Sequence, residues 1–250
     1  MRSPIPGPAR CILVATDGSR GGDHAVDVAR QLTEPGAGVD LAVVMVRRRG
    51  EVPVPTGGQA HSWRPMASAV PALEPEILIG HPSIEIAREA ERRGASLIII
   101  GRRPVEAAGT AMLGPTADQI VRGASVPCLV LSPGPWRPTP RILAAVDGTE
   151  RGERVLAGAT AIAHLLRGTV RSVTVVAAPR LSPSGRTGPD GPRVVRSGDP
   201  VDEVLAEARV GVDLLAVGVH RLGRPDSDLE RGIARRIIRQ ARGPVLTIPL

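Results

Sequence analysis

Two kinds of hydrophobic pattern alternate along this chain. Short runs rich in Ile, Leu and Val, such as residues 96–100, are typical of buried β-strands, and longer amphipathic stretches, such as residues 20–33, are typical of helices. Strands that alternate with helices predict a parallel sheet that is covered by helices on both faces. We therefore expect an α/β fold.

The alternation occurs twice, once in each half of the chain. In the first half we expect strands near 11–16, 39–46, 75–79, 96–100 and 127–131 and helices near 20–33, 83–93 and 115–123. In the second half we expect strands near 142–146, 170–176, 193–196, 213–217 and 244–248 and helices near 150–166, 201–210 and 229–241. Two segments rich in Pro and Gly are expected to be irregular loops, 47–73 (which we expect to be mobile) and 177–192.

The two halves also repeat one another in sequence. Residues 11–19 form an apolar run that ends in Asp-Gly-Ser, and residues 141–149 form one that ends in Asp-Gly-Thr. A repeat of this length indicates a duplicated domain, because each copy is long enough to bury its own core. We expect a first domain over 9–132, a Pro-rich linker over 133–140 and a second domain over 141–250.

We expect the last strand of each half to lie at an edge of its sheet. Both strands are apolar, with Leu129–Leu131 in the first half and Leu246–Ile248 in the second. An exposed apolar edge pairs readily with another strand, and the linker keeps the two edges at high effective concentration. We therefore expect the two domains to form an intramolecular pseudo-dimer through these strands, and a homodimer of the chain is a second expectation.

The composition changes how the charge is interpreted. The chain contains no Lys, Asn, Phe or Tyr, so all 32 of its basic residues are Arg. They outnumber the 25 acidic residues and leave a net charge of +7, but acidic residues alternate with Arg along helical stretches such as 85–93. Because the two aromatic residues, Trp63 and Trp136, form no row of stacking rings, we expect no nucleic-acid partner. The absence of Lys excludes a Walker A loop, a Schiff-base lysine and a kinase-type lysine.

Neither a membrane nor a metal is indicated. The apolar runs are much shorter than a membrane helix, and residues 1–8 lack the apolar core of a signal peptide, so we expect a cytoplasmic protein with no membrane partner. The five His residues have no paired ligand spacing and no Cys companions, so we expect no metal site. Cys11 and Cys128 lie inside apolar runs and are expected to be buried free thiols.

The repeated residues mark one candidate crevice in each half. Asp17 and Asp147 end the first strand of their halves, and Gly101 and Gly218 end the fourth. Ligands of such sheets bind at the carboxyl ends of the strands, where the winding direction reverses. A Gly-rich loop that leads into a helix also offers backbone N–H groups to phosphate.

At these residues the chain resembles the universal stress protein family in its tandem-domain form. The resemblance implies two tandem, Rossmann-like, five-stranded parallel sheets, each with the strand order 3-2-1-4-5. In the ATP-binding branch of the family, an Asp after the first strand and a Val at the end of the second hold the adenine and ribose end of the nucleotide. The matching residues are Asp17 and Val46 in the first half and Asp147 and Val175 in the second.

The same branch carries the motif Gly-x2-Gly-x9-Gly-[Ser/Thr], whose backbone N–H groups bind the phosphates. The first half keeps Gly101 and Gly114 at the family spacing. Pro104 replaces the middle glycine, and Pro115 replaces the hydroxyl residue. Each proline removes a backbone N–H donor and fixes φ, so both changes weaken the predicted phosphate site.

The remaining donors differ between the halves. Arg103 and Thr116 still offer contacts to phosphate in the first half. The second half keeps Gly218, but Arg221 and Arg231 occupy positions where the motif needs glycine. We therefore expect ATP to bind the first domain weakly or not at all, and the second domain even less.

The resemblance and the altered motif together predict a regulatory or stress-response module with weakened or lost ATP binding and without enzymatic activity. Two alternatives stay open. One is an ATP-binding or adenine-nucleotide-binding signalling module that uses the first domain. The other is a slow ATP hydrolase, which needs a base and a metal ligand near the phosphates, and Asp17 is the sole candidate for such a role.

Overall fold

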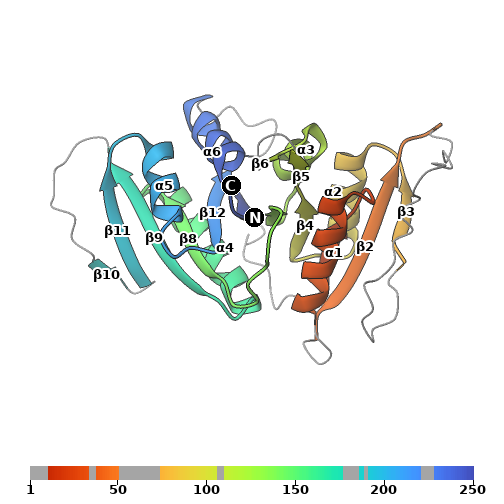
Figure 1. Cartoon of the computed structure of the whole chain (residues 1–250), viewed down its shortest axis with the longest axis horizontal. Helices are drawn as coiled ribbons and strands as arrows, with labels where there is room; N and C mark the ends of the chain where they lie inside the picture. The colour runs from red at the N-terminus through yellow and green to blue at the C-terminus, as the bar shows by residue number, and fades with distance from the viewer. Residues whose placement is uncertain are drawn as a thin grey trace.

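The computed structural model describes residues 11–33, 38–50, 74–105, 110–176, 186–188, 191–220 and 228–250. The first half contains β1 (Cys11–Ala15), α1 (Arg20–Leu32), β2 (Asp40–Arg47), β3 (Glu76–Ile79), α2 (Pro82–Arg92), β4 (Leu97–Gly101), β5 (Arg103–Val105), β6 (Thr110–Met112), α3 (Pro115–Gly123) and β7 (Cys128–Leu131). The second half contains β8 (Arg141–Val146), α4 (Glu150–Leu165), β9 (Thr169–Val176), β10 (Arg186–Gly188), β11 (Gly191–Ser197), α5 (Pro200–Ala208), β12 (Leu214–Val219), α6 (Asp228–Gln240) and β13 (Val245–Pro249). Every strand and helix expected from the sequence is present, and Figure 1 shows the two halves side by side.

Eleven strands form one sheet in the order β10-β11-β9-β8-β12-β13-β7-β4-β1-β2-β3. Within the first half, the parallel order β3-β2-β1-β4-β7 is the predicted order 3-2-1-4-5. The second half repeats this order in β11-β9-β8-β12-β13, again with parallel neighbours. The strand order of each half is therefore as predicted, but the two expected sheets are joined into one.

Strands β7 and β13 form the seam between the halves. They pair antiparallel, with Leu246 opposite Leu129 and Val245 opposite Val130. The Ser132 hydroxyl donates a further hydrogen bond across the seam to the carbonyl oxygen of Gly243, at 2.8 Å. Because the central strands of each half are parallel to one another, this antiparallel contact makes the two halves run in opposite directions. Their strands consequently have carboxyl ends on opposite sides of the sheet.

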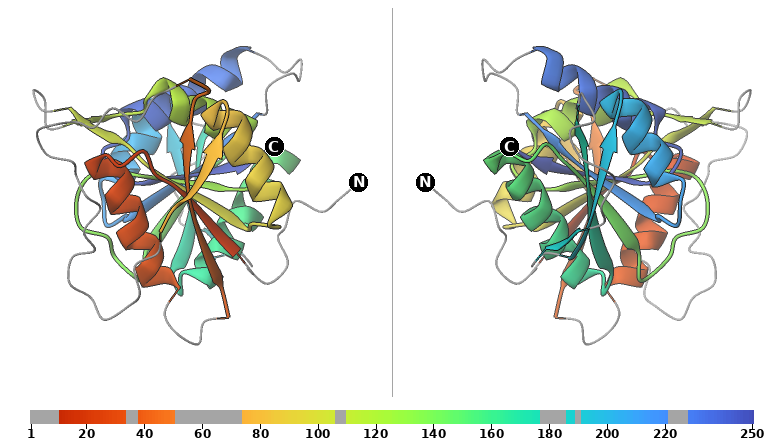
Figure 2. Two further views of the ribbon diagram at one scale, coloured as in Figure 1. Left: turned by 90° about the vertical axis from the view of Figure 1, so that its right-hand side faces the viewer. Right: turned by 90° about the vertical axis from the view of Figure 1, so that its left-hand side faces the viewer.

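Helices cover both faces of the twisted sheet, as the end views in Figure 2 show. One face is covered by α1 and α4, which bury the apolar residues Ala25, Val26, Val28, Ala29, Val155, Ala159, Ile162 and Ala163. The other face is covered by α2, α3, α5 and α6, which bury Ile86, Ala90, Ile120, Val121, Val201, Val204, Ile237 and Ile238. Each hydrophobic cluster contains residues of both halves, so the core is continuous across the seam. Within the described part of the chain, no helix is both long enough and apolar enough to cross a bilayer.

The repeated Asp-Gly-Ser/Thr segments form the turns from strand to helix. The Ser19 side chain accepts a hydrogen bond from the backbone N of Gly22 at 3.3 Å and caps α1. Thr149 accepts from the backbone N of Arg151 at 3.2 Å and caps α4. Such caps satisfy N–H groups that have no partner within the helix, and they fix where each helix begins.

Two pairs of short strands were not expected. Strands β5 and β6 form an antiparallel pair within the stretch that we expected to be the phosphate-binding loop, with Pro104 opposite Ala111. Strand β10 pairs antiparallel with β11, so the prediction that 177–192 is wholly irregular was wrong. These strands are short and lie beside Pro and Gly, whose presence argued against strands in the sequence. The expected loop 47–73 lies outside the described residues from 51 to 73, and its first residue belongs to β2.

Helix α1 approaches β4 through a pair of glycines. A Cβ atom added at Gly101 would lie 1.9 Å from the carbonyl oxygen of Gly21. A Cβ atom added at Gly21 would lie 2.2 Å from the carbonyl oxygen of Arg102. Contact this close between two backbones leaves no room for a side chain. The packing of α1 on β4 therefore requires Gly101, whatever part this residue has in ligand binding.

Helix α2 carries a buried carboxylate between two arginines. Glu89 is 6% exposed and accepts hydrogen bonds from Arg92, at 2.8 Å from Nε and 2.6 Å from Nη2, and from Arg93. The hydrogen bonds from Arg92, supported by Arg93, outweigh burial and lower the pKa of Glu89 to about 2. Glu207 holds the corresponding place in α5 and is also paired with two arginines.

Replacing Glu89 with Gln should lower the free energy of unfolding by about 1–2 kcal/mol at neutral pH. One unit of pKa corresponds to about 1.4 kcal/mol, but the partly exposed arginines reduce the net value. The folded-state pKa is depressed, so the stabilisation is complete above about pH 4.5 and is lost as the pH falls toward about 2. Urea denaturation over this pH range measures the effect, with Glu91→Gln on the exposed side of the same helix as the control. A deficit in E89Q that does not shrink at acid pH would contradict the assignment.

The two glycines of the first-half motif should respond differently to alanine. Gly101→Ala should destabilise the protein by about 3 kcal/mol or more, because its Cβ would overlap the backbone of Gly21. Gly114→Ala should change stability by less than about 1 kcal/mol, because, apart from its chain neighbours, no atom of the described residues lies within 4 Å of a Cβ added there. Thermal denaturation of both variants provides the comparison. Equal stability of the two would show that the close approach of α1 to β4 does not constrain residue 101.

Candidate functional site

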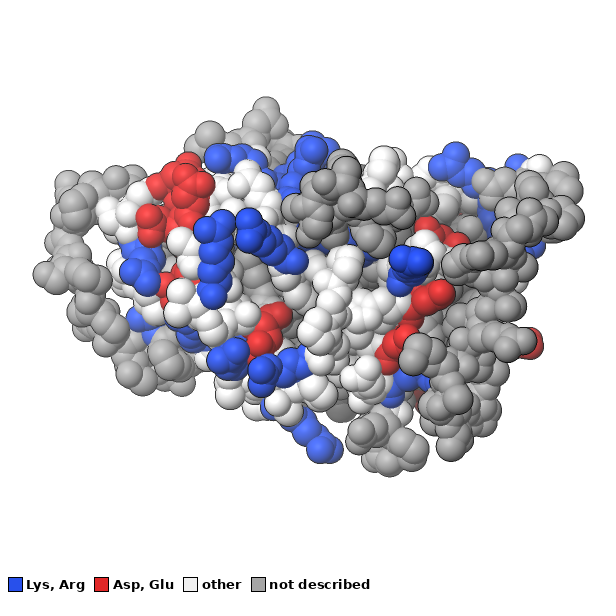
Figure 3. Space-filling model, in the orientation of Figure 1, with Lys and Arg blue, Asp and Glu red and all other residues white. Residues whose placement is uncertain are grey.

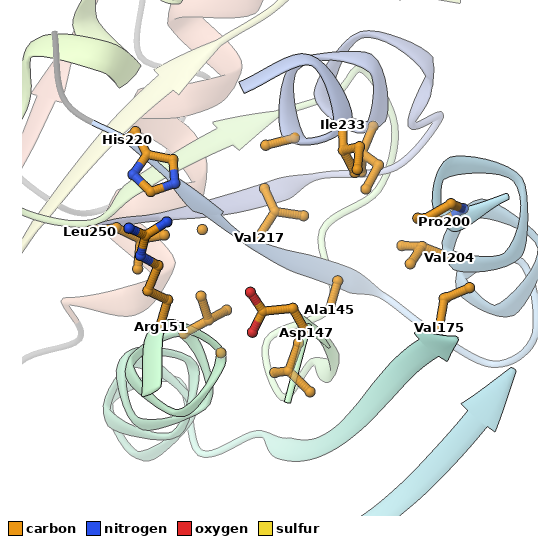
Figure 4. A pocket seen from close by; sticks show the side chains of 16 residues that line it. Ala145, Asp147, Arg151, Val175, Pro200, Val204, Val217, His220, Ile233 and Leu250 are labelled. Atoms are coloured by element: carbon orange, nitrogen blue, oxygen red, sulfur yellow. The ribbon is translucent and has the colours of Figure 1, made fainter. Parts of the chain in front are cut away.

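A cavity of about 190 Å³ lies at the carboxyl ends of the central strands of the second half. Its walls come from the ends of β8, β9 and β12, the first turns of α4 and α5, the middle of α6 and the C-terminal Leu250 (Figure 4). Asp147, Val175 and Gly218, the three residues predicted for the site of this half, all line it. They belong to three different strand ends, and the topology brings them together at the place where ligands of such sheets bind.

Asp147 supplies a fixed carboxylate at the cavity wall. Its Oδ1 accepts hydrogen bonds from the backbone N of Thr149 at 2.9 Å and from the Thr149 hydroxyl at 2.7 Å. Burial alone would raise the pKa of Asp147, but these hydrogen bonds outweigh it and hold the pKa below its ordinary value. The group is therefore charged at neutral pH and acts as an acceptor for hydroxyl or amine donors of a ligand.

Two glycines keep the region around this carboxylate tightly packed. A Cβ atom added at Gly152 would lie 2.6 Å from Oδ1 of Asp147, so glycine at this position lets the first turn of α4 approach the carboxylate. A Cβ atom added at Gly218 would lie 2.7 Å from side-chain atoms of both Val155 and Leu250. The glycine retained at 218 therefore has a packing role of its own.

Arg151 and His220 also line the cavity, and neither was predicted. In Figure 4 they lie at one end, while Val175, Pro200 and Val204 lie at the other. Comparison of the two copies contains a signal for Arg151, because the first half has Gly21 at the corresponding position. The first half thus uses this position for backbone packing, whereas the second half places a basic side chain at the cavity.

The arrangement suits a small ligand with an apolar part, hydrogen-bond donors and an acidic group. The apolar end can take a flat or branched group, Asp147 can accept from hydroxyls, and the two basic side chains can face an anion. The volume is below the roughly 300–1,000 Å³ that is usual for small-molecule sites. In the described ranges, no group of three or more His, Cys, Asp and Glu residues is placed to hold a metal ion.

The predicted residues of the first half also lie at the carboxyl ends of neighbouring strands, β1, β2 and β4. Asp17 is exposed and accepts a hydrogen bond from the backbone N of Ser19 at 3.0 Å. Val46, near the end of β2, is partly buried and packs against the hydrophobic core. Gly101 is in contact with Gly21, as described above.

Of the remaining first-half positions, Gly114 and Thr116 lie at the start of α3 and Arg103 begins β5. Gly114 is the N-cap of this helix and has no side-chain cap. Thr116 is exposed in its first turn. Arg103 is the first residue of β5, and its side chain lies outside the described part of the structure. The phosphate-binding role of these three residues stays a prediction.

Residues 9–132 match the sequence model of the Universal stress protein family. A universal stress protein from Archaeoglobus fulgidus DSM 4304 has a similar structure, with a TM-score of 0.70 and 16% identity, over 97% of this chain and 99% of its own. A putative universal stress protein from Pseudomonas aeruginosa UCBPP-PA14 is similar over 96% and 93%, with a TM-score of 0.65 and 18% identity. A functionally unknown protein from Pseudomonas aeruginosa PAO1 has a TM-score of 0.65 and 17% identity over 96% and 92%. No curated protein matches the sequence.

The structural similarities extend over nearly the whole length of the chain. Because the sequence identities are low, these similarities show the fold alone. The sequence match identifies the first half directly, and the second half repeats its strand order. The chain therefore belongs to the universal stress protein family and carries the fold of that family twice.

Proposed function

We propose that this protein is a cytoplasmic regulatory module of the stress response that binds a small adenosine-like ligand in its second half. The observation that carries the proposal is the convergence of Asp147, Val175 and Gly218 on one cavity. Residues of the first half serve mainly to support the common sheet. The assignment of the ligand to the second half reverses the preference that the spacing of the motif alone suggested.

The chemistry of the cavity favours a nucleoside or a nucleotide with a short phosphate chain. The apolar end, with Val175 and Val204, offers a surface for a base, and the Asp147 carboxylate offers an acceptor for ribose hydroxyls. The glycine motif that would bind a triphosphate is interrupted by Arg221 and Arg231 in the second half and by two prolines in the first. We therefore propose that ATP has no large advantage over adenosine.

We also propose that the protein is not an enzyme. A hydrolase would need a base to activate water, and the lowered pKa of Asp147 makes it a weak proton acceptor. This proposal is separate from ligand binding, because a regulatory module needs the occupied and empty states to differ but needs no chemical step. The slow ATP hydrolase remains the competing function, and phosphate release from ATP by the purified chain would establish it.

Titration with adenosine and ATP should locate the ligand. Asp147→Asn should weaken adenosine binding at least tenfold, because the charged acceptor becomes a neutral amide and a charged hydrogen bond is worth about 1.5–3 kcal/mol. Asp17→Asn, the matched change in the first half, should leave binding unchanged. ATP should bind the unaltered chain within about tenfold of adenosine. Isothermal titration calorimetry of the three proteins measures all of these values.

The outcomes of this titration are distinct. Loss of binding in D17N but not in D147N would place the ligand in the first half. ATP binding that is more than a hundredfold tighter than adenosine binding would show that a triphosphate site is intact. No heat with either ligand at millimolar concentration would contradict an adenosine-like ligand altogether.

The surface charge should give only weak binding to nucleic acid. Basic and acidic side chains are interspersed on the face shown in Figure 3, and several arginines are paired, among them Arg88 with Glu85 and Arg141 with Asp213. Mixed charge of this kind is screened beyond about 8 Å at physiological salt. Fluorescence anisotropy with duplex DNA should detect weak association that disappears as salt is raised. Sub-micromolar binding at physiological salt would contradict this expectation.

A further inference from the structure

Arg102 is a charged residue buried at the seam between the two halves. It follows β4 and is 1% exposed, which makes it the largest of the fully buried side chains in the described part of the chain. Burial lowers the pKa of Arg102 to about 10, so the guanidinium is still charged at neutral pH. A buried charge is costly unless hydrogen bonds compensate it, so its partners indicate its role.

The partners of Arg102 are carbonyl groups at the end of a helix of the other half. Nη1 donates to the carbonyl oxygen of Ala241 at 2.8 Å, and Nη2 donates to that of Ile238 at 2.7 Å. Ile238 lies in the last turn of α6 and Ala241 follows directly after the helix, where backbone acceptors have no partner within the helix and where the helix dipole is negative. The opposite directions of the two halves explain the contact. The carboxyl end of β4 lies across the seam from the end at which β13 begins and α6 terminates.

Helix α6 is also a wall of the candidate ligand cavity. Ile233, Ala234 and Ile237 line this cavity on one side of the helix. Ile238, whose carbonyl oxygen accepts from Arg102, borders a second cavity of about 290 Å³ that α6 shares with α3 of the first half. One helix thus connects the ligand cavity of the second half with a hydrogen-bonding group of the first.

The contact is made in one direction only. By the repeat, Val219 is the second-half residue that corresponds to Arg102, since Gly218 corresponds to Gly101. Val219 is an apolar residue and cannot donate to the end of α3 as Arg102 donates to the end of α6. The two halves are therefore unequal in this one contact, although other contacts, such as the hydrogen bond from the Thr247 hydroxyl to the carbonyl oxygen of Cys128, run from the second half to the first.

From these contacts we infer that Arg102 is a positioning residue, through which the first half fixes α6 as the wall of the ligand cavity in the second half. The inference rests on the proposed function in one respect, namely that the cavity holds a ligand. Its consequence is a coupling between the seam and the cavity. By linkage, any change that loosens the Arg102 hydrogen bonds weakens ligand binding, and a bound ligand stabilises the hydrogen bonds of Arg102 to α6.

A residue that merely contributed to stability would act differently from a positioning residue. Loss of such a residue would make amides throughout the core exchange faster. A long apolar side chain of similar size would restore their protection. Loss of Arg102 should instead lower the protection of amides in α6, which lies across the seam from the strand that precedes Arg102. Only another hydrogen-bond donor should restore this protection.

The test compares Arg102→Met with Arg102→Lys and with Arg235→Met in the full chain. Arg235 is a suitable control because it lies on α6 and also reaches across the seam, to Asp118 at 3.5 Å, but is 55% exposed at its side chain. Hydrogen–deuterium exchange of each protein is measured by mass spectrometry in the absence of ligand. In R102M the amides of 233–241 should exchange at least tenfold faster, because a lost charged hydrogen bond is worth about one power of ten in the opening equilibrium. The amides of β1 and α1 should exchange as in the unaltered chain. R102K should recover part of the protection, and R235M should match the unaltered chain.

Adenosine titration of the same proteins gives a second readout. R102M should bind adenosine at least threefold more weakly, and R235M should bind it unchanged. Unchanged exchange of α6 in R102M, or an equal increase in all helices with no recovery in R102K, would overturn the inference. If R102M does not fold, R102K alone tests the inference. The inference then requires a smaller loss of exchange protection in R102K that is confined to α6. If the unaltered chain binds no adenosine, the proposed function fails, and the exchange data alone still decide the role of Arg102.

Discussion

The antiparallel pairing of β7 with β13 is the constraint on which the rest of this structure depends. It removes two apolar edges, joins the two halves into one sheet and makes both hydrophobic clusters continuous across the seam. It also fixes the relative direction of the halves. Only because they run in opposite directions does Arg102, at the end of β4, meet the last turn of α6. The buried guanidinium is compatible with the core because that turn offers carbonyl acceptors that would otherwise lack partners.

The duplicated halves have diverged at positions that matter for a site. Gly21 in the first half closes α1 onto β4, whereas Arg151, at the corresponding position, lines the cavity of the second. Arg102 reaches across the seam, whereas its counterpart Val219 cannot. These differences fit a division of labour in which one copy has been kept for support and the other for recognition.

Much of the fold could be predicted from the sequence, because hydrophobic period and turn residues determine local structure. The strands and helices followed from these signals, and the strand order followed from the resemblance to the family. The hairpin of β5 and β6 and the pairing of β10 did not, since Pro104 and the Pro-Gly segments argue against strands. Asp147, Val175 and Gly218 line one cavity, as their places in the repeat suggested, but the sequence contains only an indirect signal for Arg151 and none for Arg102. Their roles depend on contacts between elements that are distant in sequence, and Gly101 appeared as a phosphate ligand because its contact with Gly21 leaves no local pattern.

The central claim is that the second half recognises the ligand while the first half supports it. The most direct test is an NMR titration of the isotope-labelled full chain with adenosine, in which each backbone amide reports on its own surroundings. We expect saturable shifts at Asp147, Val175, Gly218 and His220, together with smaller shifts along α6. Shifts confined to Asp17, Val46 and Gly101 would contradict the claim and would place recognition in the first half.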